Sequence, residues 1–127
     1  MEEIKAGDIM LNNWFHVNGY PMYVDSIFRD TVYLEFEGNE GDVWEENIKD
    51  LKPIPLTEDI LLKAGFEKDE EGLFSSYPTI VAKTKTRWAF YNNGLSGGEL
   101  VRIDYLHQLQ NLVRILTGND LKINIGV

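Results

Sequence analysis

The sequence predicts an α+β protein: an N-terminal SH3-like barrel of short antiparallel strands, then a small antiparallel sheet packed by a C-terminal amphipathic helix. Residues 7–55 alternate short apolar strands with turn residues, residues 56–66 have the ends of a short helix, and residues 105–117 carry apolar side chains at helical spacing. We therefore expect an SH3-like module over 1–55. A helix, an antiparallel sheet and the C-terminal helix should follow over 56–127, packed with the first module as one unit.

The strands of the first part are recognised by a period of two. TVYLEFE, residues 31–37, alternates apolar and polar side chains, which is typical of a strand with one buried face. NGYP (Asn18–Pro21) and GNEGD (Gly38–Asp42) form turns between such stretches. Short strands at this spacing are typical of a small barrel. We expect core or half-buried positions for the three tryptophans, Trp14, Trp44 and Trp88.

The join between the two parts is marked by prolines. Pro53 and Pro55 cannot extend a central strand, so the first part should end there. A short helix follows, in which Thr57 is a good N-cap and Gly65 provides a left-handed C-terminal stop. After this helix we expect a charged loop, then the strands of the second sheet, and last the C-terminal helix.

The final helix has an apolar and a polar side. Steps of roughly 100° per residue place the polar side chains on the outside. The apolar stripe should cover the second sheet, and it comprises Leu106, Leu109, Leu112, Val113 and Leu116. The polar face comprises His107, Gln110, Asn111 and Arg114. Three of its members project at i, i+4 and i+7, which suits a recognition surface. The alternative interpretation is an ordinary solvated face.

A basic stretch lies in the second half. LFSSY, TIVAKTKTRWAFYN and ELVRI read as three strands. On the second, Lys83, Lys85 and Arg87 alternate and share one face, with Tyr91 further along it. Bases beside aromatic rings on a sheet hold single-stranded nucleic acid in some proteins. The alternative interpretation is an exposed strand whose lysines prevent edge pairing.

The charge is −9 in 127 residues, which argues against generic DNA binding because phosphate affinity comes from Lys and Arg. Residues 1–63 carry 14 acids and 5 bases, whereas residues 64–127 carry 7 of each. All the net acidity therefore lies in the first half. A second nucleic-acid-linked alternative is that this acidic half imitates a phosphate backbone and occupies a DNA-binding protein.

Few residue types are available for chemistry. The chain lacks cysteine, which excludes disulfides, thiolate metal sites and cysteine nucleophiles. Its two histidines, His16 and His107, lack metal-ligand spacing, and the acidic stretch lacks the order of a calcium loop. We expect no catalytic site, no metal and no cofactor. The apolar runs are shorter than the roughly 18 residues of a membrane helix, and we expect a cytoplasmic protein without membrane contact.

Two sequence blocks resemble a known group. LKPIPLTEDILLKAGFEK (Leu51–Lys68) and YLHQLQNLVRILTGNDLKI (Tyr105–Ile123) are similar to blocks found together in small uncharacterised proteins of Bacteroides-type bacteria, their prophages and their phages. Here Leu106 replaces the usual valine before His107. The resemblance covers most of the chain, more weakly over about 67–102. It implies a bacterial cytoplasmic setting and a mobile-element origin, and it assigns no functional residue.

These observations favour a non-enzymatic protein-interaction module, an accessory protein of a phage or mobile element. Its partner would be another protein or a second copy of the chain, and its candidate surface is the polar helix face. The alternative is a nucleic-acid-linked role, either through Lys83–Arg87 or through acidic mimicry by the N-terminal half. Net charge disfavours that alternative.

Overall fold

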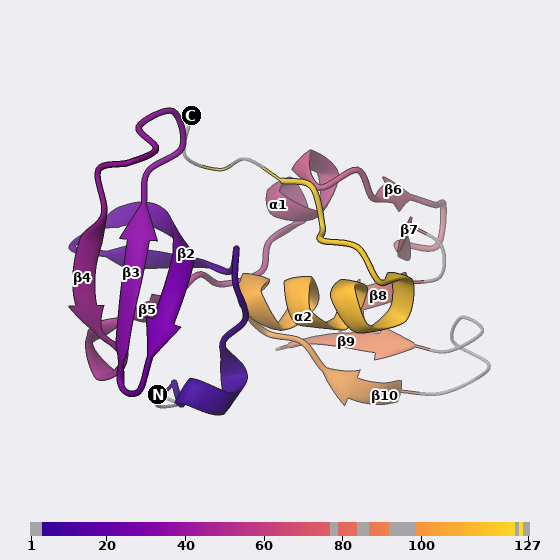
Figure 1. Cartoon of the computed structure of the whole chain (residues 1–127). Coiled ribbons are helices and arrows are strands. Elements are labelled where there is room, and N and C mark those ends of the chain that lie inside the picture. The colour runs from indigo at the N-terminus through magenta and orange to yellow at the C-terminus, as the bar shows by residue number, and fades with distance from the viewer. Residues whose placement is uncertain (1–3, 77–78, 84–86, 92–98, 124, 126–127) are drawn as a thin grey trace. The chain divides into compact units, whose positions relative to one another are not determined.

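The computed structural model describes residues 4–76, 79–83, 87–91, 99–123 and 125. The chain divides into two compact units, Met1–Ile54 with Asn124–Val127 and Pro55–Ile123. Each unit contains one five-stranded antiparallel sheet, and the second also contains the C-terminal helix (Figure 1). The predicted α+β class is confirmed.

The first unit is a meander. Its sheet has the order β4-β3-β2-β1-β5, so consecutive strands pair and the last returns beside the first. Its elements are η1 (Ala6–Asp8), β1 (Trp14–Val17), β2 (Tyr20–Phe28), β3 (Thr31–Glu35), β4 (Trp44–Asn47), η2 (Ile48–Asp50) and β5 (Lys52–Pro53), where η marks a 3-10 helix.

The β1–β2 turn confirms the turn predicted from NGYP. Asn18 and Gly19 both have positive φ, 51° and 85°. An Asn-Gly pair adopts these angles at low cost, which makes it a strong hairpin signal. The flanking pair is Val17 with Tyr20, so Tyr20 lies directly beside the tip of this hairpin.

Strand β2 joins the two halves of the sheet. Tyr20 to Tyr23 pair with β1, and Tyr23 to Phe28 pair with β3. The register with β3 shifts between Val24 and Ser26, and a bulge of this kind bends a strand. One face of this bent sheet packs on the hydrophobic core, which comprises Ile4, Ile9, Phe15, Val17, Met22, Val24, Val32, Leu34, Ile48 and Leu51.

The first sheet does not close into the barrel that the sequence predicts. Its last strand, β5, has only two residues, and Pro53 lacks an N–H group. β5 pairs with β1 only at Phe15 with Pro53 and at His16 with Lys52. Closure needs backbone donors along the last strand, and Pro53, half of this two-residue strand, provides none.

The second unit begins with α1 (Glu58–Lys63). The Thr57 side chain accepts a hydrogen bond from the backbone N–H of Ile60 at 3.2 Å, as an N-cap does. Gly65 follows with φ of 90°, and the N–H of Phe66 donates to the Leu61 carbonyl at 3.0 Å. Both predicted ends of this helix are confirmed.

The second sheet has the order β10-β9-β8-β7-β6. Its strands are β6 (Glu67–Lys68), β7 (Phe74–Ser76), β8 (Thr79–Lys83), β9 (Trp88–Tyr91) and β10 (Glu99–Arg102). The stretch predicted as one long strand is two strands, paired from Lys83 with Trp88 to Ile80 with Tyr91. The period of two continues in both arms of this hairpin, and the connection lacks the Gly, Pro or Asn that marks most turns.

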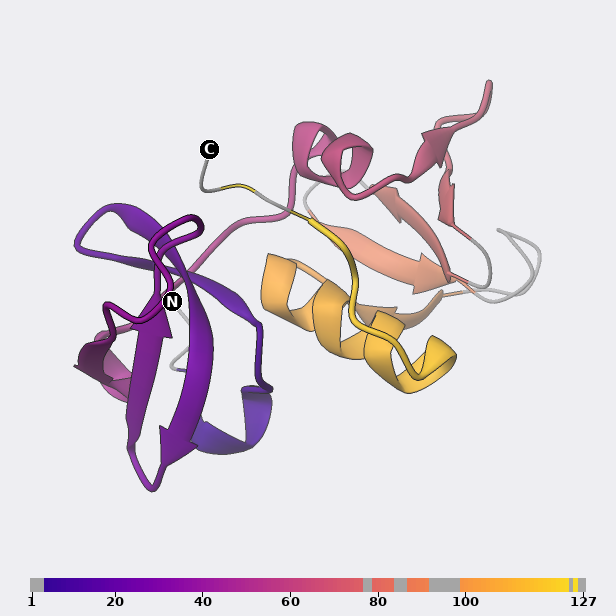
Figure 2. The same ribbon diagram turned by 45° about the horizontal axis from the view of Figure 1, so that its top comes forward.

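The C-terminal helix α2 (Leu106–Thr117) lies beside the second sheet in both views (Figures 1 and 2). It ends at Gly118, which has φ of 78° and donates its N–H to the Arg114 carbonyl at 2.9 Å, as predicted. Among the described residues, the helices are all too short and too polar to cross a bilayer.

Candidate functional site

The four polar residues of α2 do not share one exposed face. His107 and Gln110 are buried, with 4% and 7% of their surface exposed. Asn111 is half-buried, whereas Arg114 is exposed and forms a salt bridge with Asp120 at 3.5 Å. The expectation that these side chains project together into solvent is therefore wrong.

The apolar stripe of α2 is confirmed only in its first turns. Leu106, Leu109 and Val113 are buried, but Leu112 is half-buried and Leu116 is 41% exposed. All four residues of the last turn, 114–117, are exposed. A helical wheel treats every turn alike, whereas this helix extends beyond the part of the protein that covers it.

The buried arc of α2 also differs from the predicted arc. At roughly 100° per residue, Gln110 lies between Leu106 and His107 around the helix axis. All three side chains are buried, so the buried arc is centred about 80° from the predicted one. The His107 ring is stacked on the Tyr105 ring, with centroids 6.0 Å apart and an angle of 14° between the planes.

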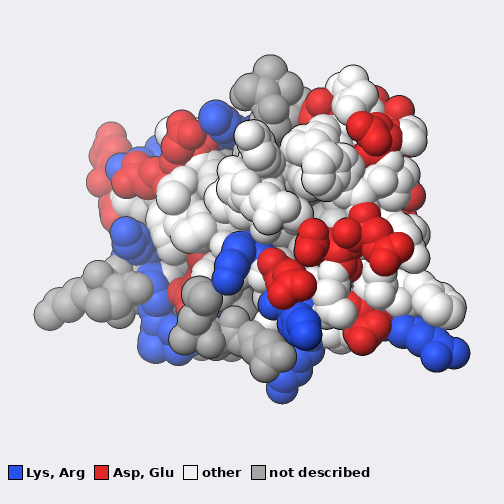
Figure 3. All heavy atoms as spheres, turned by 90° about the vertical axis from the view of Figure 1, so that its left-hand side faces the viewer, with Lys and Arg blue, Asp and Glu red and all other residues white. Residues whose placement is uncertain are grey.

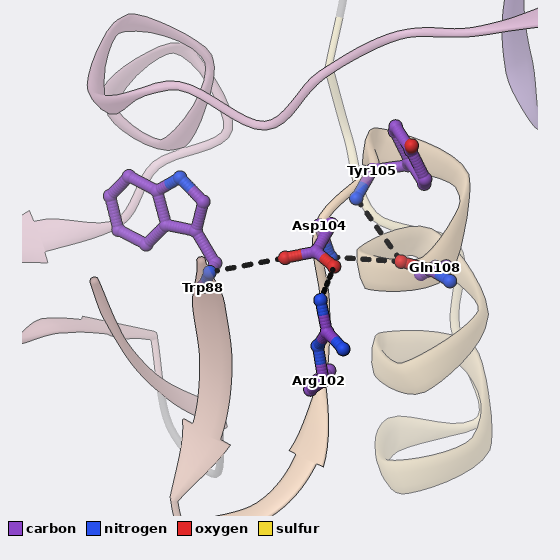
Figure 4. A network of polar contacts seen from close by, with 5 residues as sticks. All are labelled: Trp88, Arg102, Asp104, Tyr105 and Gln108. Atoms are coloured by element: carbon purple, nitrogen blue, oxygen red, sulfur yellow. Dashed lines mark hydrogen bonds and ion pairs between the residues drawn. The ribbon is translucent and has the colours of Figure 1, made fainter. Parts of the chain in front are cut away.

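Gln108 caps the beginning of α2. Its Oε1 accepts the backbone N–H groups of Asp104 at 2.9 Å and of Tyr105 at 3.1 Å (Figure 4). N–H groups at a helix start lack carbonyl partners inside the helix. A glutamine at the third helical position that reaches back to the N-cap forms half of a capping box. This polar residue is therefore explained by folding.

Asp104 connects α2 to the neighbouring strands. Its Oδ1 accepts the Trp88 N–H at 3.3 Å, and its Oδ2 pairs with the Arg102 guanidinium at 3.1 Å (Figure 4). Its backbone carbonyl accepts the N–H of Leu56 at 2.9 Å. We call Trp88, Arg102, Asp104, Tyr105 and Gln108 the junction network.

The basic residues of the nucleic-acid alternative are not aligned on one strand. Lys83 is exposed, and its Nζ lies 5.8 Å from the centroid of the buried Trp88 ring. Tyr91 is buried and pairs with Ile80, three residues from Lys83, so the two lie on opposite faces of the sheet. Half-buried Arg87 precedes β9, and Lys85 lies outside the described residues. Lys83 ends β8 and Arg87 precedes β9, so these two residues do not lie along one strand, and the common face expected for Lys83 and Tyr91 is wrong.

Three aromatic residues of the first unit form a surface that sequence reasoning missed; we call Tyr20, Phe36 and Trp44 the aromatic triad. The Tyr20 and Phe36 ring centroids are 6.1 Å apart at 81°, and those of Phe36 and Trp44 are 5.9 Å apart at 87°. Tyr20 is 62% exposed and Trp44 is 44% exposed. Edge-to-face contacts hold the rings in fixed orientations while leaving ring surface open.

The exposure of Trp44 corrects a prediction. Trp14 and Trp88 are buried as expected, whereas Trp44 is the first residue of β4, an edge strand of the first sheet. It pairs with Leu34, whose side chain is fully buried. Among the described residues, no further strand pairs with β4 on its outer side. Its place at a sheet edge could not be known from a local pattern.

Acidic residues lie in the chain segment that joins Phe36 to Trp44, and we call them the acidic border of the triad. The connection between Phe36 and Trp44 contains the exposed side chains of Glu37, Glu40 and Asp42. The Oε2 atom of buried Glu35 accepts the Gly41 N–H at 3.1 Å and so holds this connection to β3. Figure 3 shows an uncharged area on the side of the molecule that carries β4, with Asp and Glu and also some Lys and Arg around it.

The same acids act on Tyr23. Partial burial raises the pKa of Tyr23 above its usual 10.0, and the charges of nearby carboxylates raise it further. These carboxylates belong to Glu40, Glu35, Glu37 and Asp25, in decreasing order of effect. The negative potential of this part of the first unit favours cationic ligands.

Neither a metal centre nor a relative points to another site. Among the residues that the structure describes, no three His, Asp or Glu side chains gather as metal ligands would. No protein-family model, curated protein or solved structure matches the chain. The aromatic triad and its acidic border are therefore the candidate site on geometric grounds.

Proposed function

We propose that the chain is a non-enzymatic protein-interaction module that binds a basic segment of a partner protein through the aromatic triad. The observation that carries this proposal is the contact of Tyr20, Phe36 and Trp44 at an exposed, acid-bordered position. Exposed aromatic groups of this kind are typical of binding hot spots. From the two sequence blocks, we further propose a cytoplasmic accessory protein of a phage or mobile element.

The proposal includes an SH3-like fold for the first unit, in an open form. Support comes from β2, which pairs with both halves of the sheet and bends at its bulge. It also comes from β5, which follows η2 and returns beside β1. In this arrangement the β1–β2 turn and the β3–β4 connection carry the triad between them.

The chemistry of the surface indicates a basic partner. A Lys or Arg side chain is attracted to the face of an aromatic ring within about 6 Å of its centroid. The carboxylates of Glu37, Glu40 and Asp42 also attract a positively charged side chain. An acidic partner would meet repulsion from the same groups.

The size of the surface indicates a short segment of the partner. A stable interface between folded domains buries about 800 Å² on each side. Three partly exposed rings provide only a few hundred Å², which is the size of the largest apolar patch on an ordinary monomer. A linear peptide that places one basic and one apolar side chain on the rings fits this area.

The test uses an array of peptides matched in length that are basic, neutral or acidic, probed with the full chain. We expect binding to basic members and weakening as salt rises, because mobile ions screen the acidic border. Trp44→Ala should weaken that binding about 30-fold, the loss that about 2 kcal/mol at a hot spot produces. The matched control is Phe28→Ala, which removes another aromatic side chain, 62% exposed, from outside the triad.

The outcomes separate the alternatives. An equal loss of peptide affinity in Trp44→Ala and Phe28→Ala would exclude the triad as the recognition surface. Binding of acidic peptides would exclude it as well. If the chain self-associates and Trp44→Ala abolishes this association, the partner of the triad is a second copy of the chain and not another protein.

A further inference from the structure

A small pocket of the first unit has a charge opposite to that of its surroundings. It lies where η1, the β2–β3 turn and η2 meet, at the lower end of this unit in Figure 1. Its volume is about 230 Å³. Its lining includes three cations, one carboxylate and two buried apolar side chains: Lys5, Arg29, Lys49, Asp30, Ile4 and Ile48.

The cations of the first unit are concentrated here. Residues 1–54 contain 12 acidic and 4 basic side chains, and three of the four bases line this one pocket. Within the described part of the chain, Lys5, Arg29 and Lys49 take part in no salt bridge. Three like charges around one small volume repel each other, and the single carboxylate of Asp30 balances only one of them.

Backbone contacts hold the lining in place. The N–H of Ile48 donates to the Asp30 carbonyl at 2.9 Å, which joins η2 to the β2–β3 turn. The Asn47 side chain accepts the N–H of Lys49 at 3.2 Å and caps η2. Two of the three segments that line the pocket, η2 and the β2–β3 turn, are therefore fixed relative to one another.

Arg29 has a backbone conformation that its residue type disfavours. Its φ is 59°, and the other non-glycine residues with positive φ in the described part of the chain, Asn12 and Asn18, are asparagines. Asparagine tolerates this region, whereas arginine occupies it at a cost. The Arg29 guanidinium lies 5.2 Å from the centroid of the Phe28 ring. An uncommon backbone conformation at a residue that lines a pocket is consistent with a binding role.

We propose that this pocket binds a dianionic phosphate group, either inorganic phosphate or the phosphate of a small monoester. The three cations and the carboxylate of Asp30 leave two net positive charges, which match a dianion better than a carboxylate. The volume lies below the roughly 300–1,000 Å³ of pockets for drug-sized ligands, which fits a small oxyanion rather than a nucleotide. The site is distinct from the aromatic triad, and the two are tested independently.

The test is a titration of the full chain with inorganic phosphate and with glycerol phosphate, followed by the backbone amide signals in NMR spectra. We expect saturable shifts of the Arg29, Ile48 and Lys49 amides. Affinity for glycerol phosphate should rise between about pH 5 and pH 7, because a phosphate monoester loses its second proton near pH 6. Affinity for inorganic phosphate should rise at a higher pH, because its second proton is held more tightly. Tighter binding of inorganic phosphate would identify the free ion as the ligand, and tighter binding of glycerol phosphate would identify a monoester.

Four variants test the assignment. Arg29→Gly suits the positive φ and should retain the fold, yet it should weaken phosphate binding about tenfold or more by removing a charged donor. Lys49→Gln should weaken it similarly, whereas Asp30→Asn should strengthen it by removing the one carboxylate of the lining. The matched control is Lys52→Gln, the basic residue of this unit outside the pocket, which should change affinity less than about twofold.

Two results would overturn the proposal. One is the absence of saturable shifts with millimolar phosphate in the unaltered protein. The other is an equal loss in Lys52→Gln and Lys49→Gln, which would show that phosphate responds to overall charge rather than to the pocket.

Discussion

The junction network of the second unit and the aromatic triad of the first use side chains in opposite ways. In the junction network, polar side chains bind other parts of the fold: Gln108 accepts two backbone N–H groups and Asp104 contacts both Trp88 and Arg102. In the triad, large rings remain at the surface although they contact one another. Residue type alone would assign the first to a surface and the second to a core.

The difference lies in what each region must satisfy. The beginning of α2 has N–H groups without helical partners, and their burial without acceptors would be costly. Polar side chains therefore gather there for the stability of the fold. The triad lies beside the tip of the β1–β2 hairpin and at the edge strand β4, and Tyr20 and Trp44 are exposed there. We infer that the first region determines stability and the second determines binding.

The largest expected effect is on stability. Gln108→Ala removes the acceptor of two backbone N–H groups, at about 1 kcal/mol each, so the free energy of unfolding should fall by about 2 kcal/mol. Urea unfolding followed by circular dichroism measures this loss. Arg114→Ala, an exposed residue of the same helix, is the control and should change stability by less than about 0.5 kcal/mol. A loss of peptide binding in Gln108→Ala at unchanged stability would reverse the assignment of the two regions.

Much of the fold could be predicted from local signals. The Asn18–Gly19 turn, the Thr57 cap and the Gly65 and Gly118 stops each depend on a few neighbouring residues, and each is present. Barrel closure depends on pairing between segments far apart in the chain, and it was predicted wrongly. The prediction of one continuous basic strand is wrong for a related reason. A hairpin whose connection lacks turn residues has the sequence pattern of a single strand.

The candidate sites are harder to predict than the fold, because each is formed by residues that lie far apart in the sequence. Tyr20, Phe36 and Trp44 come from three segments, and nothing in the spacing of these residues indicates that their rings meet. Lys5, Arg29 and Lys49 are separated by about 20 residues each and look like isolated charges in an acidic half. The HQLQN stretch was misleading because capping side chains and recognition side chains are of the same chemical types.

An intermediate effect is expected for the coupling inside the triad. Edge-to-face aromatic pairs contribute about 0.5–1.5 kcal/mol beyond their buried area. A double-mutant cycle of Phe36→Ala and Trp44→Ala should therefore give a coupling near the middle of that range in urea unfolding. The cycle of Phe36→Ala with Phe28→Ala is the control and should show additivity. Additive effects in the first cycle would mean that the rings are not held together and do not form a prepared surface.

The smallest expected effect is a pH dependence at Tyr23. Because its folded pKa is raised above the 10.0 of an ordinary tyrosine, the folded protein keeps this proton at a pH where the unfolded chain loses it. The contribution to stability is complete below about pH 10 and is lost as pH rises through the folded value. Tyr23→Phe should show a weaker fall in unfolding free energy above pH 10 than the unaltered protein. Glu40→Gln should lower the Tyr23 pKa in an ultraviolet difference titration, because it removes the largest carboxylate contribution. A Tyr23 pKa that is unchanged in Glu40→Gln would show that the acidic border does not act on this part of the first unit. The proposal of a cationic ligand for the triad would then depend on the aromatic rings alone.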